Sequence, residues 1–320
     1  MIDYLLPNKV INQKRNIEGF IKEFLFFLGF CLLFAFAGAA MTILLGKIWD
    51  IDNFSNLAKV LSEKSEPDTR NTIRYYLILS HSFTFALPCI AYAIWRNRQQ
   101  ALSALKLHQT PHPNNILYSG IIILAAFPFV MLTMWLNQQI PISETMIEME
   151  KMANEMAKNL LVMNSTYEFI LTLIAVAATA AIGEELMFRG ILQPMFEKVF
   201  KNGHIAVWIT AVLFSAIHGQ MHGFIPRMLL GAILGYFFLW SRNLWIPIFA
   251  HFVFNGSQVV LKYSTPIQIE NPEVEFNQII IPAIASLVII IGLGNLFRKF
   301  NLQKVTKETN KINENQILDE

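Results

Sequence analysis

Two adjacent carboxylates, Glu184 and Glu185, stand directly after a long apolar run of the sequence, and Arg189 follows four residues after the second one. A carboxylate near the interior of a bilayer costs about 2.5–3.5 kcal/mol on insertion scales. Ionisable residues in such places are by default candidates for a functional site. The acidic pair therefore predicts chemistry inside a membrane.

Two further motifs supply partners for this pair. They are Phe214-x-x-x-His218 and His251-x-x-x-Asn255. His218 follows Glu185 by 33 residues, and His251 follows His218 by another 33. This spacing is suited to three separate membrane helices that face one centre.

Helical geometry divides the two glutamates between different roles. Neighbouring residues on a helix point about 100° apart, so both carboxylates cannot address one site equally. Glu185 and Arg189 form an i,i+4 pair with the acid first, which is the favourable order. We therefore predict a structural Glu185–Arg189 ion pair that leaves Glu184 free to act.

The residue types predict hydrolysis of an amide bond by water. A carboxylate held in a low-dielectric setting can act as a general base, and a nearby histidine can hold the attacking water. A second histidine and an asparagine amide offer hydrogen bonds to a developing oxyanion. The same chemistry could instead involve zinc: Glu184, His218 and His251 resemble a catalytic zinc shell with an open position. The His-Glu-x-x-His zinc signature is absent, and both mechanisms remain open.

The composition places the chain among membrane proteins. Of 320 residues, 54% are hydrophobic and 15% are charged, whereas soluble domains carry about 25% charged residues. The formal net charge of +2 is too small to indicate a nucleic-acid partner. Cys31 and Cys89 both lie within apolar runs and are interpreted as small core residues.

The fold class predicted from these runs is all-α: a polytopic transmembrane helical bundle of about eight spans. Each span needs about 20 mostly apolar residues, and the fifth and sixth are weaker than the others. The predicted spans are Phe24–Leu45, Ile73–Trp95, Leu117–Leu136, Tyr167–Leu186, Ile205–His218, Phe224–Trp240, Leu244–Leu261 and Ile279–Phe297.

The connecting loops predict the orientation in the cell (plasma) membrane. Lys and Arg in excess mark the cytoplasmic side. In an eight-span topology all the basic loops fall on one side, so both termini are predicted to be cytoplasmic. The basic positions are Lys9, Lys14, Arg15, Lys22, Arg96, Arg98, Lys106, Lys198, Lys201, Arg242, Arg298 and Lys299, whereas the loop at 264–277 carries only Glu270, Glu273 and Glu275.

We predict five regions along the chain. They are a cytoplasmic N-terminal segment (1–23), variable transmembrane helices and loops (24–163), a catalytic four-helix membrane core (164–262), an outer loop with the last span (263–297) and a polar C-terminal tail (298–320). Ser143–Asn164 is expected to be a connecting helix. His81, alone in the second span, is interpreted as a helix-packing residue, and His222 and Arg227 as structural residues at a helix break.

Taken together, the three motifs resemble the CPBP family of intramembrane proteases, which are CaaX proteases and bacteriocin-processing enzymes also called the Abi family. The family pattern is Glu-Glu-x-x-x-Arg, then Phe-x-x-x-His, then His-x-x-x-Asn or Asp. Each part is present here in that order, and the resemblance covers about Tyr167 to Leu261.

The resemblance implies an endopeptidase that cuts a membrane-associated or lipidated protein or peptide. It implies that Glu184 and His218 activate water and that His251 and Asn255 stabilise the oxyanion, with Glu185, Arg189 and Phe214 as structural support. It leaves a glutamate-type and a metal-dependent enzyme open, so zinc is the one cofactor considered. The sequence does not specify the substrate or the oligomeric state.

Two other functions are consistent with a polar cluster in a membrane. One is a non-catalytic immunity or scaffold protein that keeps the cluster for binding. The other is a proton-coupled transporter with Glu184 as the relay. No internal repeat, common in transporter folds, is evident in the sequence, and no motif position is missing, so hydrolysis is the favoured function.

Overall fold

The computed structural model describes residues 8–48, 61–62, 64–265 and 276–318, and every regular element in these ranges is helical. The predicted all-α bundle is confirmed. The helices are α1 (Asn8–Ile48), α3 (Pro67–His81), η3 (Ser82–Ala86), α4 (Leu87–Asn97), η4 (Arg98–Gln100), α5 (Ala101–Ala104), α6 (Pro113–Ala125), α7 (Phe127–Gln138), α8 (Glu144–Leu160), α9 (Thr166–Thr172), η5 (Leu173–Ala178), α10 (Thr179–Glu185), η6 (Leu186–Leu192), α11 (Gln193–Phe200), α12 (Gly203–Ala216), α13 (Phe224–Ser241), α14 (Trp245–Ser264) and α15 (Phe276–Leu318).

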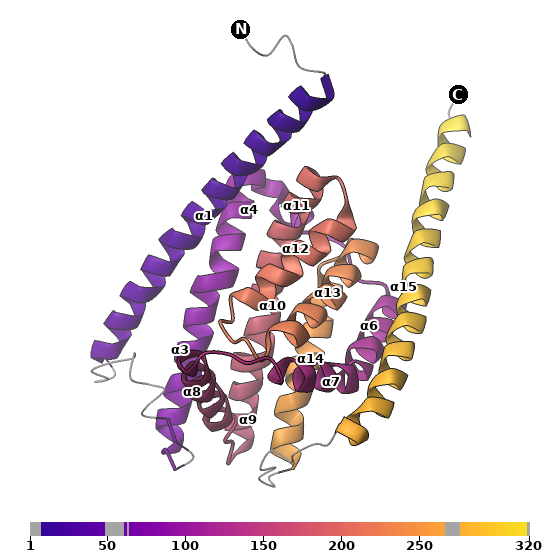
Figure 1. Cartoon of the computed structure of the whole chain (residues 1–320). Helices are drawn as coiled ribbons and strands as arrows, with labels where there is room; N and C mark the ends of the chain where they lie inside the picture. The colour runs from indigo at the N-terminus through magenta and orange to yellow at the C-terminus, as the bar shows by residue number, and fades with distance from the viewer. Residues whose placement is uncertain (1–7, 49–60, 63, 266–275, 319–320) are drawn as a thin grey trace.

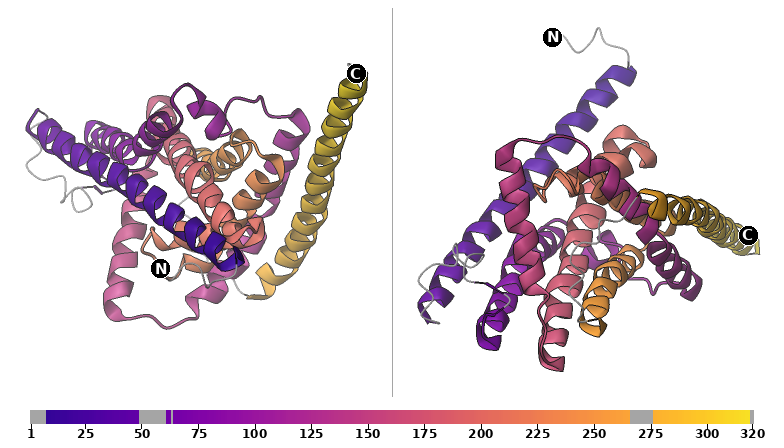
Figure 2. Two further views of the ribbon diagram at one scale, coloured as in Figure 1. Left: turned by 90° about the horizontal axis from the view of Figure 1, so that it is seen from above. Right: turned by 60° about the horizontal axis from the view of Figure 1, so that its bottom comes forward.

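The two longest helices, α1 and α15, lie at opposite edges of the bundle, and α10 to α14 lie between them (Figure 1). The view from above shows α15 standing to one side of the central helices (Figure 2). In Figure 1 the start of α1 and the end of α15 both lie at the upper end, while α8 lies at the lower end with α3 and α9.

Six of the described helical segments are long and apolar enough to cross a membrane, and the chain is a multi-pass membrane protein. Two of the eight predicted spans fall outside this set. Helix α12 is apolar but has only 14 residues. Helix α14 has 20 residues but carries His251, Asn255 and Gln258, which lower its hydropathy. The six segments are Ile17–Lys47, Pro67–Ala104, Pro113–Gln138, Thr166–Phe200, Phe224–Ser241 and Phe276–Gln303.

Two of these segments are interrupted by π-helical turns. Helix α3 continues through η3 into α4, and α9 continues through η5, α10 and η6 into α11. Pro88 and Pro194 stand in the first turn after η3 and after η6. Proline has no N–H and its ring clashes with the carbonyl four residues before it, so the wider π turns accommodate these two residues. At the junction of η5 and α10, the hydroxyl of Thr179, the first residue of α10, donates to the carbonyl of Ile174 in η5 at 2.7 Å.

Helix α13 packs closely on its neighbours through Gly231 and Gly235. The side chain of Gln193 on α11 donates to the carbonyl of Gly235 at 3.0 Å. A Cβ at position 235 would lie 3.0 Å from Val207 Cγ1 and 3.1 Å from Gln193 Oε1. Both neighbours are fully buried. The two glycines therefore permit close helix packing and leave their main-chain carbonyls accessible as acceptors.

Because neither neighbour of Gly235 has room to retreat, Gly235→Ala is expected to lower the free energy of unfolding by about 1–3 kcal/mol, as overpacking does. The matched control is Gly292→Ala on α15, where an added Cβ meets no atom within 4 Å and alanine favours the helix. Denaturant unfolding in detergent would compare the two. Equal stability of both variants would contradict close packing at Gly235.

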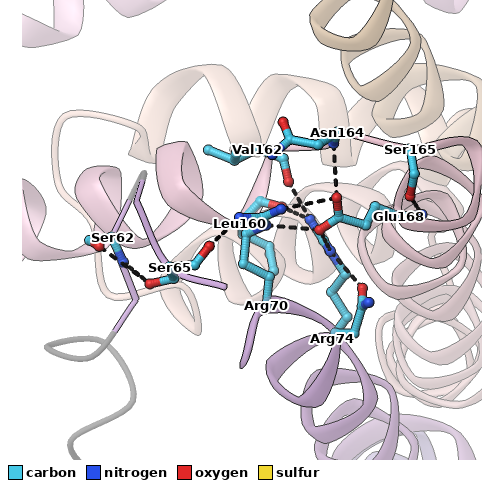
Figure 3. Close-up of polar contacts among 10 residues, drawn as sticks. Ser62, Ser65, Arg70, Arg74, Leu160, Val162, Asn164, Ser165 and Glu168 are labelled. Atoms are coloured by element: carbon cyan, nitrogen blue, oxygen red, sulfur yellow. Dashed lines mark hydrogen bonds and ion pairs between the residues drawn. The ribbon is translucent and has the colours of Figure 1, made fainter. Parts of the chain in front are cut away.

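A buried charge cluster joins α3, α8 and α9 at the lower end of the bundle (Figure 3). Arg70 places Nε 2.8 Å and Nη2 3.0 Å from the two carboxylate oxygens of Glu168. Arg74 donates to Glu168 Oε1 at 2.9 Å and to the carbonyls of Leu160 and Val162 at 3.1 Å and 2.5 Å. The two guanidinium groups thus fix the end of α8 and the turn that leads into α9.

The opposite end of the bundle gathers the basic loops. Glu23 accepts from Arg96 at 3.2 Å and from Lys198 at 3.1 Å, which joins α1, α4 and α11. The amide of Leu244 donates to the carbonyl of Lys106, and the side chain of Asn243 donates to the carbonyl of Gln109. The α4–α6 connection and the α13–α14 turn therefore lie at the same level.

Several regional predictions have direct outcomes. The connecting helix predicted at Ser143–Asn164 is present as α8, and Ser143 caps it by accepting from the amide of Met146 at 3.4 Å. The polar tail is largely helical, because α15 continues to Leu318. Cys31 and Cys89 are free thiols. The acidic residues predicted for the outer loop, Glu270, Glu273 and Glu275, lie outside the described residues.

Candidate active site

Glu184 and Glu185 end helix α10 in the centre of the bundle, and the π turn η6 begins at the next residue. Glu184 is 5% exposed and Glu185 is fully buried. π-helical turns occur frequently at functional sites, and here three of them, η3, η5 and η6, lie next to α10 in sequence or in space. Both carboxylates are thus removed from solvent and must find their partners within the protein.

Glu185 forms the predicted pair with Arg189. Arg189 Nη1 donates to Glu185 Oε1 at 2.6 Å, and both side chains are fully buried. The second guanidinium nitrogen, Nη2, donates to the carbonyl of Gly231 at 2.7 Å. The guanidinium carbon lies 4.9 Å from the centre of the Phe214 ring. Arg189 therefore ties α10 and η6 to α12 and α13.

His251 on α14 lies between the two glutamates. Its Nδ1 lies 2.8 Å from Glu185 Oε1, and its Nε2 lies 3.9 Å from Glu184 Oε2. His251 is 3% exposed. Since Glu185 Oε1 also accepts from Arg189, it is an acceptor for the Nδ1–H of His251, and this bond directs Nε2 towards Glu184. Sequence reasoning placed His251 in the site but did not predict its contact with Glu185.

His218 is oriented by the aromatic residue of its own motif. Its Nδ1 lies 2.8 Å from the carbonyl of Phe214, and the two rings are 5.3 Å apart. A carbonyl only accepts, so Nδ1 carries the proton, and Nε2 of the neutral ring keeps a lone pair. His218 interacts electrostatically with Glu184, without a hydrogen bond or ion pair between these two described side chains.

Asn255 stands one turn beyond His251 on α14. Its amide nitrogen donates to the carbonyl of Val176 in η5 at 3.3 Å. This bond uses one of the two amide hydrogens and leaves the second one for another acceptor. The residue is partly exposed. Like His218, it has no direct bond to Glu184 among the described contacts.

The partner that sequence reasoning missed is His81. It ends α3, and its Nε2 lies 3.3 Å from Glu184 Oε1. The sequence predicts a helix-packing role, and the ring does pack against Phe85, in a tilted arrangement with centroids 4.4 Å apart. One feature of the sequence does point to His81: it is an ionisable residue inside a predicted span, and such residues are candidates for a function.

The charges of this cluster do not cancel with the acidic pair and Arg189 alone. Arg189 pairs with Glu185, whereas the buried carboxylate of Glu184 is flanked by ring nitrogens of His81 and His251. Buried charges are stable only when they are paired. The two histidines are therefore the nearest groups in the described contacts that can compensate the charge of Glu184.

The loop after His218 lies beside a cavity of about 1590 Å³. Glu150 on α8 accepts from the amide of His222 at 2.7 Å and contacts its Nδ1 at 2.7 Å. Asn137 on α7 donates to the carbonyl of Met221 at 2.5 Å. The cavity lining includes Gln220, His222, Gly223, Arg227, Phe254 and Gln258. His222 and Arg227 thus shape the loop and the cavity wall, as predicted for structural residues at a helix break.

The side chains considered for zinc do not form a metal shell in this arrangement. One nitrogen of His251 is taken by Glu185, and its other nitrogen is 3.9 Å from Glu184. Across the described residues there is no group of three or more His, Cys, Asp or Glu side chains that could hold a metal ion. A zinc site at Glu184, His218 and His251 stays a prediction, and no step below depends on it.

Comparison with known proteins points to the same part of the chain. Residues 166–257 match the model of the family described as type II CAAX prenyl endopeptidase Rce1-like. The matched segment contains Glu184, His218, His251 and Asn255, and it excludes His81. No solved structure matches the chain.

Two proteins of Bacillus subtilis (strain 168) share shorter segments. One, "Uncharacterized protein YpbD", is 31% identical over 80 residues, which are 24% of this chain and 38% of that protein. The other, "Putative membrane peptidase YdiL", is 27% identical over 93 residues, 29% of this chain and 37% of that protein. The chain thus matches well under half the length of either relative.

Proposed function

Starting from the resemblance to the CPBP family, which the comparisons confirm for residues 166–257, we propose that this membrane protein is an intramembrane endopeptidase. It would hydrolyse a peptide bond of a membrane-associated or lipidated protein or peptide. The observation that carries the proposal is the position of His251 between Glu184 and Glu185. A histidine held by one buried carboxylate beside a second one can donate its other N–H to a developing oxyanion, a role that packing alone does not require.

Water activation is assigned to Glu184 with His218. Glu184 Oε2 accepts a proton from water, and the resulting hydroxide attacks the carbonyl carbon of the scissile bond. His218, whose Nδ1–H is held by Phe214, offers its Nε2 lone pair to the second hydrogen of the same water. The proton on Glu184 then passes to the leaving amine as the C–N bond breaks, which returns the carboxylate to its starting state.

Oxyanion stabilisation is assigned to His251 and Asn255. The protonated ring of His251 presents Nε2–H while its Nδ1–H donates to Glu185. Asn255 has its second amide hydrogen available next to the bond with Val176. One such donor is worth about 10²–10³-fold in kcat where it has been removed in other hydrolases. Arg189 and Phe214 keep the Glu185 carboxylate in place beneath His251.

One experiment distinguishes the metal-free glutamate mechanism from a zinc mechanism. Purified protein would be incubated with a library of membrane-embedded peptides, with and without exhaustive chelation. Cleavage that survives chelation supports the glutamate mechanism, and cleavage that is lost and returns with zinc supports the metal. If no peptide is cleaved, bacteriocin precursors included, the result would favour the non-catalytic immunity or scaffold function.

The proposed orientation places both termini in the cytoplasm. The ion pairs of Glu23 with Arg96 and Lys198 support it, because they bring basic residues from three helices to one end of the bundle. Single cysteines introduced at Gln109 and at Gln139, in a variant without Cys31 and Cys89, are expected to react differently in intact cells. A membrane-impermeant maleimide should label the second and spare the first. Labelling only of the cysteine that replaces Gln109 would indicate the opposite topology.

A further inference from the structure

A second histidine contacts the carboxylate of Glu184, from outside the segment that matches the protease family. His81 belongs to α3, and its Nε2 lies 3.3 Å from Glu184 Oε1. The Nε2 atom is buried and lies within hydrogen-bond distance of this carboxylate, without the angle of a regular hydrogen bond to it or to another described group. It is thus a buried ring nitrogen whose nearest charged group is the carboxylate proposed as the general base.

The surroundings of His81 hold the ring in this position. Phe85 packs against it in a tilted arrangement, at a centroid distance of 4.4 Å and an interplanar angle of 31°. Gly183, the residue before Glu184, permits the approach: a Cβ there would lie 2.9 Å from Phe85 Cβ and 3.4 Å from His81 Cδ2. The π turn η3 starts at the residue after His81. Two helices therefore converge where the ring meets the carboxylate.

The two oxygens of Glu184 have different neighbours. Oε1 faces His81 Nε2, and Oε2 faces His251 Nε2. A donor on Oε1 fixes the plane of the carboxylate and leaves Oε2 as the oxygen that receives the proton from water. This division matters because a displacement of about 1 Å at a reacting group can cost about 10²-fold in rate.

We propose that His81 is a positioning residue that donates its Nε2–H to Glu184 Oε1 and so presents Oε2 to the attacking water. The proposal rests on the proposed function, since it assigns Glu184 the role of general base. It adds to the matched segment a residue from the N-terminal helices, which sequence reasoning treated as variable.

Three substitutions separate this role from packing. His81→Phe keeps an aromatic ring on Phe85 and removes the donor. His81→Gln places an amide N–H near the position of Nε2, whereas His81→Asn places it near Nδ1. We expect Phe and Asn to lower kcat by about 10–100-fold with little change in KM, because His81 does not touch the substrate. The kcat of the His81→Gln variant should be at least about tenfold higher than that of the His81→Phe variant.

Equal kcat of the Gln and Asn variants, or wild-type kcat in the Phe variant, would overturn the proposal. Glu184→Gln, assayed in parallel, keeps the two ideas distinct. If Glu184→Gln still cleaves, the proposed function fails. If Glu184→Gln is inactive while His81→Phe cleaves normally, only the role of His81 fails.

A spectroscopic test does not depend on cleavage. In protein labelled with ¹⁵N at the histidine rings, the signals absent from His81→Gln identify His81. We expect its Nε2 to carry a proton in the wild-type protein and its resonance to move in Glu184→Gln. A ring protonated only at Nδ1, or one that does not respond to Glu184→Gln, would contradict the hydrogen bond.

Discussion

Replacing Glu184 with glutamine is expected to lower kcat by about 10²–10⁴-fold, which is the range for loss of a general base. Glutamine preserves the size of the side chain and can still interact with His81 and His251, but it cannot take a proton from water. The fold should be retained, because the change removes a buried charge that has no guanidinium partner and leaves the Glu185–Arg189 pair intact. The measurement is single-turnover cleavage of a membrane-embedded peptide.

The control for this variant is Glu197→Gln. Glu197 lies twelve residues after Glu185. It pairs with Arg242 in a contact with side chains that are 25% and 49% exposed, unlike the buried acidic pair. It should cleave at the wild-type rate. If Glu184→Gln cleaves as fast as Glu197→Gln, the assigned mechanism is wrong, and Glu184 belongs to the framework of the bundle.

Replacing Arg189 with methionine is expected to lower the free energy of unfolding by about 3–5 kcal/mol, as removal of one partner of a buried ion pair does. The change leaves Glu185 fully buried without its countercharge. It also leaves the carbonyl of Gly231 without the Nη2 donor. Thermal or denaturant unfolding in detergent would measure the loss.

The double variant Glu185→Gln with Arg189→Met tests the cause of that loss. Replacing both members of a buried pair is often neutral or even stabilising, so the double variant should recover at least about half of the lost stability. Arg242→Met, at the exposed pair, should cost no more than about 1 kcal/mol. A double variant as unstable as Arg189→Met would show that the unpaired carboxylate is not the cause.

The sequence predicted most of the frame of this molecule. Apolar runs of membrane length placed all eight helical regions. The i,i+4 rule predicted the Glu185–Arg189 pair, because both residues lie on one helix and their contact depends only on local geometry. The catalytic roles of Glu184, His218, His251 and Asn255 stay predictions until the variants are assayed.

Contacts between helices could not be predicted in the same way. His251 reaches Glu185 from 66 residues away, and His81 reaches Glu184 from α3. Such contacts depend on the rotation and depth of each helix, which hydropathy leaves undetermined. The π turns near Pro88 and Pro194 change that rotation, since each adds to the turn a residue that a regular α-helix would not hold.

The number of membrane spans shows a second limit, which concerns hydropathy itself. Helix α14 was counted from its apolar residues, yet its polar face lines the site. The polar side chains of α14 bond to groups of α10 and η5. The helix therefore needs a lower hydropathy than a helix that faces lipid. Hydropathy measures contact with lipid, and it underestimates a helix whose partners are protein groups.

The length of α12 has a consequence for the lipid around the protein. Its 14 residues rise about 21 Å, whereas a bilayer hydrocarbon core is about 30 Å thick. Ile205, Trp208 and Val212 on this helix are exposed by 41–43%, so its outer face is apolar and meets acyl chains. A short apolar segment is matched by thinning of the bilayer beside it. We therefore expect lipid headgroups and water to stand closer to the middle of the bundle along α12 than beside its longer helices. A membrane-embedded peptide next to α12 would then have its buried amide bonds nearer to the aqueous boundary.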